Sequence, residues 1–180
     1  MIYFLFAQGF EESEGIIPYD MLKRAGLEVV LASVADTLAV TGGHGLSVNC
    51  DIFASAIKKE TIELLVLPGG SVGTENLDQS EVVNGLLQYA WEKNLPIAAI
   101  CAAPSILGKR GFLKGKEAIC YPDFFEYLEG AVISDKNVVI DGNMITAKAA
   151  GASFDFGLAL VEFLADKETA EKIKASIFYQ

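Results

Sequence analysis

Histidine is scarce in this chain, and no apolar stretch is long. The 180 residues include one histidine and three cysteines, and the cysteines stand in no CxxC or Cys/His spacing. Neither a zinc site nor a disulfide framework is therefore indicated. No apolar run reaches the roughly 18 residues that a spanning helix needs. The N-terminus lacks the basic flank of a signal peptide, so a cytoplasmic protein is expected.

Positive charge is also scarce. Fourteen basic residues face 24 acidic ones, which gives a net charge of −10 at pH 7. This charge repels phosphate backbones and anionic lipid surfaces, so nucleic acid and membrane partners are disfavoured. Hydrophobic residues make up 52% of the chain and charged residues 21%, which is enough apolar material for a packed core. We expect one domain over residues 1–180.

Short apolar runs recur along the chain and predict strands over 2–7, 27–34, 64–67, 96–101, 138–140 and 144–147. Such runs lack in/out alternation, which is typical of a mostly parallel sheet covered by helices on both faces. Amphipathic stretches predict helices over 13–25, 79–93, 103–109, 152–164 and 167–175. The pattern indicates an α/β doubly wound sandwich, in which ligands bind beyond the carboxyl ends of strands. A glycine-rich segment at 41–48, which is either a hairpin or an irregular excursion, and an aromatic segment at 118–132 interrupt this regularity.

Cys101 stands at a predicted strand-to-helix turn. It ends the run 96–101, and Pro104 suits the first turn of the helix that follows. A thiol at this position lies near the positive end of the helix dipole, which predicts a lowered pKa and a nucleophilic, oxidisable sulfur. The alternative is a buried cysteine that only packs.

Two other strand ends carry candidate residues. Gly69 and Gly70 follow the run 64–67, where backbone amides free of Cβ interference indicate either an oxyanion hole or a simple tight turn. An acidic segment that ends at Glu14 opens the first helix, where the dipole favours carboxylates. A carboxyl group turned inward beneath Cys101 would have a raised pKa and could act as an acid/base partner. No GxGxxG or Walker sequence is present, which excludes those nucleotide-binding loops.

In this order, the motifs resemble the ThiJ/PfpI superfamily and, within it, the branch named for the parkinsonism-associated DJ-one protein. The matching segments span 9–14, 17–18, 23–26, 66–70, 98–104 and 151–156. The resemblance implies a flavodoxin-like fold, a homodimer and a site without metal or cofactor. It makes Cys101 the reactive thiol and Glu14 the carboxyl hydrogen-bonded to it. Gly69, Gly70 and Ala102 would form the anion pocket.

The sequence departs from the family pattern near the thiol. Family members commonly carry a histidine where this chain has Tyr121, and a phenol with an ordinary pKa of about 10 is a poor base near neutral pH. Ala102 stands where the protease-like branch has a histidine, which argues against a Cys–His peptidase. Ala103 stands where glycine is usual and adds a methyl group near the strand-to-helix turn at Cys101, called the elbow below.

Three further residues are candidates for a part in the site. The only histidine, His44, is either a solvated loop residue or a base supplied in trans to the partner subunit's pocket. Neither Cys50 nor Cys120 stands at the start of a predicted helix as Cys101 does. Cys120 either packs or lines the pocket, and Cys50 is expected near the surface of the 41–48 segment.

The resemblance implies two functions that use the same groups. In the first, the protein is a glyoxalase or deglycase for small α-oxoaldehyde substrates such as methylglyoxal, or for early glycation adducts. Cys101 would attack the aldehyde carbon and Glu14 would move the proton. In the second, it is a redox-sensing or stress-protective protein whose Cys101 is oxidised to sulfinic acid without turnover.

Overall fold

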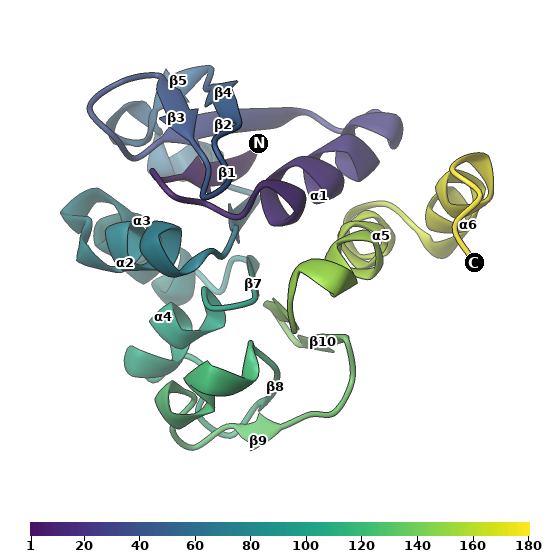
Figure 1. Cartoon of the computed structure of the whole chain (residues 1–180). Coiled ribbons are helices and arrows are strands. Elements are labelled where there is room, and N and C mark those ends of the chain that lie inside the picture. Colours follow the sequence, from purple (N-terminus) through teal and green to yellow (C-terminus); the bar gives the residue numbers. More distant parts are fainter.

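The computed structural model describes residues 1–180 and has a central sheet of seven strands in the order β10-β11-β7-β6-β1-β2-β5. All neighbouring strands are parallel except β10 and β11. The predicted α/β class with a mostly parallel sheet is thereby confirmed (Figure 1). The strands are β1 (Ile2–Phe6), β2 (Val29–Ser33), β5 (Ile52–Phe53), β6 (Leu64–Leu67), β7 (Ile97–Ile100), β10 (Val138–Asp141) and β11 (Met144–Ala147).

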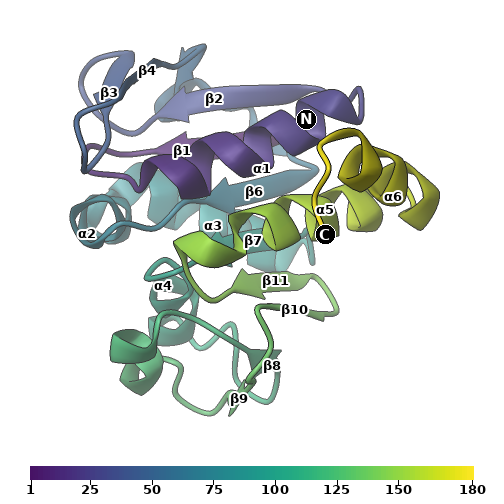
Figure 2. The ribbon, with the colours of Figure 1, turned by 45° about the vertical axis from the view of Figure 1, so that its right-hand side comes forward.

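Helices cover both faces of the sheet. α1, α5 and α6 lie on one face, and α2, α3 and α4 lie on the other (Figures 1 and 2). Strands β1, β6 and β7 are buried along their whole length, which is why their sequences read as continuous apolar runs. The helices are α1 (Glu12–Arg24), α2 (Ser71–Gln79), α3 (Glu81–Glu92), α4 (Pro104–Lys109), α5 (Ser153–Leu164) and α6 (Lys167–Ser176).

Five of these helices were predicted with ends within two residues of those observed, but α2 was not predicted. The reason is its composition: its buried residues are Gly73, Thr74 and Leu77, so only one large apolar side chain faces inward. A helix without an apolar stripe gives no periodic signal in the sequence. Its neighbour α3 has both the stripe and a cap, because the Ser80 hydroxyl accepts the Val83 N–H at 3.3 Å.

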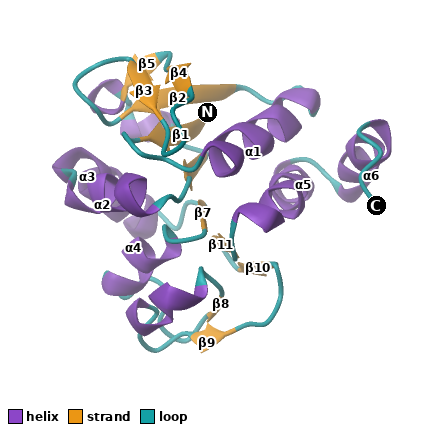
Figure 3. Cartoon of the chain, in the orientation of Figure 1, coloured by secondary structure: helices purple, strands orange, loops and turns teal.

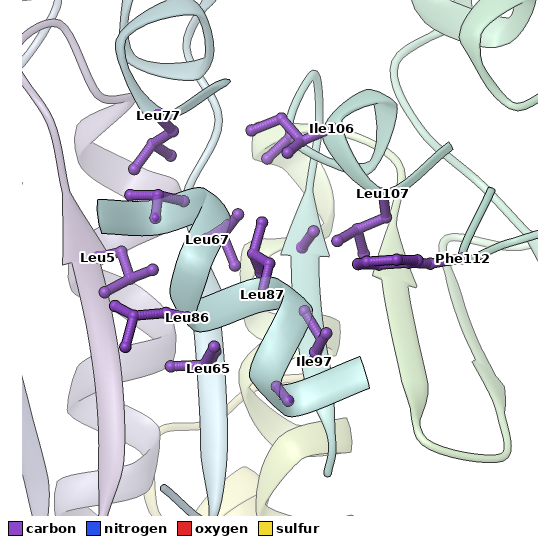
Figure 4. Close-up of a cluster of buried hydrophobic side chains, with 14 of the residues drawn as sticks. Leu5, Leu65, Leu67, Leu77, Leu86, Leu87, Ile97, Ile106, Leu107 and Phe112 are labelled. Carbon is purple, nitrogen blue, oxygen red and sulfur yellow. The ribbon is translucent and has the colours of Figure 1, made fainter. Parts of the chain in front are cut away.

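The larger hydrophobic core cluster lies between the sheet and α3 (Figure 4). Leu86 and Leu87 of α3 face the leucines of β1 and β6, and Leu87 is fully buried. A second cluster on the opposite face packs the sheet against α1 and α5. The strands are therefore clamped from both sides, which holds their carboxyl ends in fixed positions.

Two accessory segments leave the main sheet (Figure 3). Of the two alternatives for the glycine-rich segment, the structure has the hairpin, in which β3 (Ala39–Thr41) pairs antiparallel with β4 (Ser47–Asn49). The aromatic segment contains β8 (Glu117–Ala118), a 3₁₀ helix η3 (Pro122–Tyr127) and β9 (Val132–Ile133). Shorter 3₁₀ turns are η1 (Ala54–Ala56), η2 (Lys59–Thr61) and η4 (Ala150–Ala152). None of the helices is both long and apolar enough to cross a lipid bilayer.

The order of the strands places the candidate motifs side by side. The chain runs from β1 to β2 on one side and then returns to β6 and β7 on the other, so the topological switch point lies between β1 and β6. Ligands of open α/β sheets bind at such points. The segments that follow β1, β6 and β7 are the acidic segment, the glycine pair and Cys101, and they meet at this edge.

Candidate active site

Cys101 occupies a strained turn between β7 and α4. Its φ is 63°, in the left-handed region, which costs a residue other than glycine about 1–3 kcal/mol. The backbone is tied on both sides, because the Cys101 N–H donates to Ala147 at 2.9 Å and its carbonyl accepts from the Tyr121 N–H at 2.7 Å. The predicted turn is confirmed, and it leaves the thiol partly exposed.

Glu14 is the acid that turns inward. It lies on the face of α1 that also buries Pro18, Met21 and Leu22, and none of its surface is exposed. Its Oε2 accepts the Gly69 N–H at 3.0 Å. Its Oε1 meets no group at hydrogen-bonding geometry, yet the carboxyl group and the Cys101 thiol are close enough to shift each other's pKa.

The environment of Glu14 suits it to proton transfer at neutral pH. Burial is the main cause that raises the pKa of Glu14 to about 7, and the negative charge of Glu11 also raises it. The hydrogen bonds with Cys101 and with the Gly69 N–H act in the opposite direction. A carboxyl group with this pKa is present in both protonation states near pH 7. It can therefore accept and return a proton within one reaction cycle.

The thiol differs from the expectation. Burial raises the pKa of Cys101 to about 12, and the neighbouring Glu14 adds to the rise, while the amides of Gly70 and Ala102 act in the opposite direction. The predicted lowering was wrong because loss of hydration outweighs the dipole of α4, which has only six residues. The resting nucleophile is a thiol that needs a base during attack.

The two glycines are required by close approach. A Cβ at Gly69 would lie 2.5 Å from Glu14 Oε2 and 2.7 Å from the Cys101 Cβ. Gly70 has a φ of 86°, and a Cβ there would lie 2.5 Å from the Gly9 carbonyl oxygen. Because the Gly69 amide already donates to Glu14, the expectation that it belongs to the anion pocket is corrected: Gly69 positions the acid. The amides of Gly70 and Ala102 are the ones that face the sulfur.

His44 lies in the loop of the β3–β4 hairpin, with its side chain 75% exposed. Its Nδ1 is 2.9 Å from Glu12 Oε2 and 3.6 Å from Glu11 Oε2, and the hydrogen bond to Glu12 raises the pKa of His44. Ligand atoms of these three side chains lie within 4.8 Å of one another, an arrangement that their ionic pairing explains. His44 makes no hydrogen bond to the Cys101 of its own chain, so its action in trans stays a prediction.

No side-chain hydrogen bond joins Tyr121, Cys50 or Cys120 to Cys101 or Glu14. Tyr121 contacts the elbow through its backbone N–H, and its side chain is exposed. Cys120 is buried, in agreement with one of its two expected roles, and Cys50 is buried as well, which corrects the surface position expected for it. The residues that meet at the thiol are therefore Glu14, Gly69, Gly70 and Ala102.

Comparison with known proteins matches this arrangement. The model of the DJ-1/PfpI family matches residues 1–163. The chain belongs to the DJ-1/PfpI family. Protein dj-1beta of Drosophila melanogaster is 35% identical over 171 residues, which cover 94% of this chain and 91% of the relative. A DJ-1/PfpI relative from Pyrococcus horikoshii, named a deglycase, is 34% identical over 149 residues, which cover 82% of this chain and 89% of that protein.

The fold of this chain agrees with that of a solved structure of the DJ-1/PfpI family over nearly its whole length. The oxidised DJ-1 of Toxoplasma gondii superposes with a TM-score of 0.94 at 34% identity, and the match covers 99% of this chain and 97% of that one.

A polar cavity between α2 and α4, which is lined by Thr74 and Ser105 among others, was not predicted from the sequence. It could have been found from the spacing of polar residues along 71–79, once that segment is recognised as a helix.

Proposed function

We propose that this protein is a cofactor-free enzyme of the glyoxalase or deglycase type, which acts on α-oxoaldehydes such as methylglyoxal or on their early glycation adducts. The observation that carries the proposal is the buried Glu14, with a pKa of about 7 and an unbonded oxygen, beside the Cys101 thiol. The relatives named deglycases in two Pyrococcus species support the same reaction class.

The first step joins the thiol to the aldehyde. As the sulfur of Cys101 attacks the aldehyde carbon, the S–H proton passes to the Glu14 carboxylate. The carbonyl oxygen becomes an oxyanion near the amides of Gly70 and Ala102, which supply hydrogen bonds where the charge develops. Glu14 then returns the proton to this oxygen, and a hemithioacetal results. The raised pKa of the thiol makes this base necessary.

The second step moves hydrogen between the two carbons. Glu14 takes the hydrogen on the former aldehyde carbon as a proton and gives it to the neighbouring carbon, while the hydroxyl proton on the first carbon moves to the oxygen of the second. The first carbon becomes the thioester carbonyl and the second carries the hydroxyl group, so the hemithioacetal is converted into a thioester of a 2-hydroxy acid. Water then hydrolyses the thioester and releases the Cys101 thiol. With methylglyoxal the product is lactate, and the sum of the steps is the addition of one water without an external oxidant.

Lactate formation from methylglyoxal tests the proposal. Cys101→Ala should abolish turnover, and Glu14→Gln should lower kcat by about 10²- to 10⁴-fold, the contribution of a positioned acid/base group. The matched control is Cys50→Ala, which removes a buried thiol outside the site and should retain activity. Full turnover by either site variant would contradict the mechanism.

A redox function is the second candidate, favoured by the Toxoplasma gondii relative solved in an oxidised form. Two peroxide molecules would convert Cys101 to sulfinic acid with release of water, and protonated Glu14 would hydrogen-bond the product. The raised pKa of Cys101 lowers the fraction of reactive thiolate near neutral pH, which places this function second. It predicts a gain of two oxygen atoms in intact mass after dilute peroxide, absent in Cys101→Ala.

We further propose that the protein is a cytoplasmic homodimer, as the family resemblance implies. Light scattering coupled to size exclusion measures the oligomeric state directly. If His44 acts in trans, His44→Ala lowers the reactivity of Cys101 in the dimer. Unchanged reactivity would show that the ring serves only its pairing with Glu12.

A further inference from the structure

Asp78 links the two helices that begin near the reactive thiol. It lies in the last turn of α2, where the negative end of the helix dipole disfavours an acid. Both of its carboxylate oxygens have partners: Oδ2 accepts from Lys109 Nζ at 2.8 Å, and Oδ1 accepts from the Arg110 guanidinium at 2.7 Å. Both cations lie at the end of α4. The three charged side chains form a link between the helices that we call the Asp78 clamp.

The clamp is the only polar connection between α2 and α4. Arg110 also donates to the Asp78 carbonyl oxygen at 3.3 Å, and no other hydrogen bond or ion pair joins residues 71–79 to residues 104–110. Toward solvent, a polar groove separates the two helices. The side chains of Asp78 and Arg110 are each 21% exposed, so water and salt screen this pair less than a pair on the open surface.

Arg110 extends the clamp to α3 and to α4 itself. Its Nη2 donates to the side-chain oxygen of Asn84 in α3, and its Nη1 donates to the Ile106 carbonyl oxygen at 2.7 Å. That carbonyl group belongs to a helix of only six residues. A helix this short is marginal without tertiary contacts. The conformation of α4 therefore depends on its buried side and on the clamp at its end.

The opposite ends of the same two helices carry the amides that face the sulfur. Gly70 is the N-cap of α2, and Ala102 immediately precedes the N-cap of α4. The N–H groups of both residues act on the Cys101 thiol. A hydrogen-bonded helix moves as a rigid element, so a restraint on the far ends of the pair also restrains the distance between these two amides. Donors held in place in this way need no rearrangement when charge develops.

We propose that Asp78 is a positioning residue: it holds α4 against α2 and thereby keeps the two amides in place around the sulfur. The inference rests on the proposed function only for its effect on turnover, in which the same amides receive the oxyanion. Its effect on the thiol itself requires no substrate, because the amides also support the thiolate. The two effects can therefore be measured separately.

Alkylation of Cys101 by iodoacetamide at one fixed pH tests the proposal without a substrate, with Cys101→Ala as the background. Asp78→Asn and Arg110→Gln should each lower the rate by about three- to tenfold, part of the effect of one hydrogen bond to a charged group. Loss of charge alone predicts opposite changes, because removal of the Asp78 charge favours the thiolate and removal of the Arg110 charge disfavours it. Slowing in both variants, with no further slowing in the double variant, supports positioning.

Turnover of methylglyoxal provides the second measurement. In Asp78→Asn, kcat should fall by about tenfold, a part of the roughly 10²- to 10³-fold that one oxyanion donor contributes, while KM stays within about twofold. Leu160→Ala is the control for general loss of stability. It empties a fully buried position in the cluster on the opposite face of the sheet and leaves the clamp intact, so alkylation and kcat should keep their native values.

Opposite changes in the alkylation rate, no change in either variant, or a similar loss in Leu160→Ala would overturn the proposal. If Asp78→Asn does not fold, Arg110→Lys takes its place. A lysine keeps the charge but cannot bond to Asp78, Asn84 and the Ile106 carbonyl together, so slower alkylation supports the proposal and an unchanged rate overturns it. Absence of methylglyoxal turnover in the native protein would count against the proposed function alone, since the alkylation rates still decide the role of Asp78.

Discussion

Glu14→Gln should change how the stability of the protein depends on pH. Glutamine has nearly the same shape, and its side-chain oxygen can still accept the N–H of Gly69, so the contact at 3.0 Å is retained. What disappears is the titration of a buried carboxyl group. In the native chain, burial raises the pKa of this group from 4.5 to about 7.

The sign follows from proton binding. Between pH 4.5 and 7 the folded chain holds a proton on Glu14 that the unfolded chain has lost, so this contribution to stability is fully present below pH 4.5 and is lost as pH rises through 7. The difference between the two pKa values corresponds to about 3 kcal/mol, at about 1.4 kcal/mol for each pKa unit. The variant has no such loss.

Urea unfolding at several pH values between 5 and 8 measures the effect. The unfolding free energy of Glu14→Gln, relative to that of the native chain, should increase by about 2–3 kcal/mol from the acid to the alkaline end of this range, because part of the effect is already lost at pH 5. All other titrating groups are common to both proteins and cancel in the difference. Parallel curves would refute the reasoning, because they would mean that Glu14 has an ordinary pKa in the folded state.

Three further predictions concern the glycine pair after β6, the core and the hairpin. Gly70→Ala places a methyl group 2.5 Å from the Gly9 carbonyl oxygen at a φ of 86°. The unfolding free energy measured in urea should therefore fall by roughly 2 kcal/mol, and an unchanged value would disprove the strain. Leu87→Ala empties a fully buried position (Figure 4) and should cost about 2–5 kcal/mol, measured by the same assay; a cost below 1 kcal/mol would indicate a loose core. Glu12→Gln removes the main cause of the raised pKa of His44, so an NMR titration should show that pKa falling toward 6.5, and no change would exclude the pairing.

Much of the architecture could be predicted from local sequence. The strands at 64–67 and 144–147 were predicted with the ends that the structure has, because strands buried on both faces need continuous apolar residues. The turn at Cys101 could also be predicted, because an apolar run followed closely by a proline indicates that a strand ends and a helix begins there. The helix α2 was not, because its exposed and cavity-facing positions hide the helical period.

The sequence alone determined the class of fold, the place of the reactive cysteine and the family resemblance, since these depend on the order and spacing of residues along the chain. Only the tertiary structure decided the chemistry of the site. In the folded chain Glu14 is buried and accepts the Gly69 N–H, and burial raises the pKa of the Cys101 thiol. Folding also brings Thr74 and Ser105 to one cavity. Hydration and proximity between distant segments control these properties, and both arise only when the chain is folded.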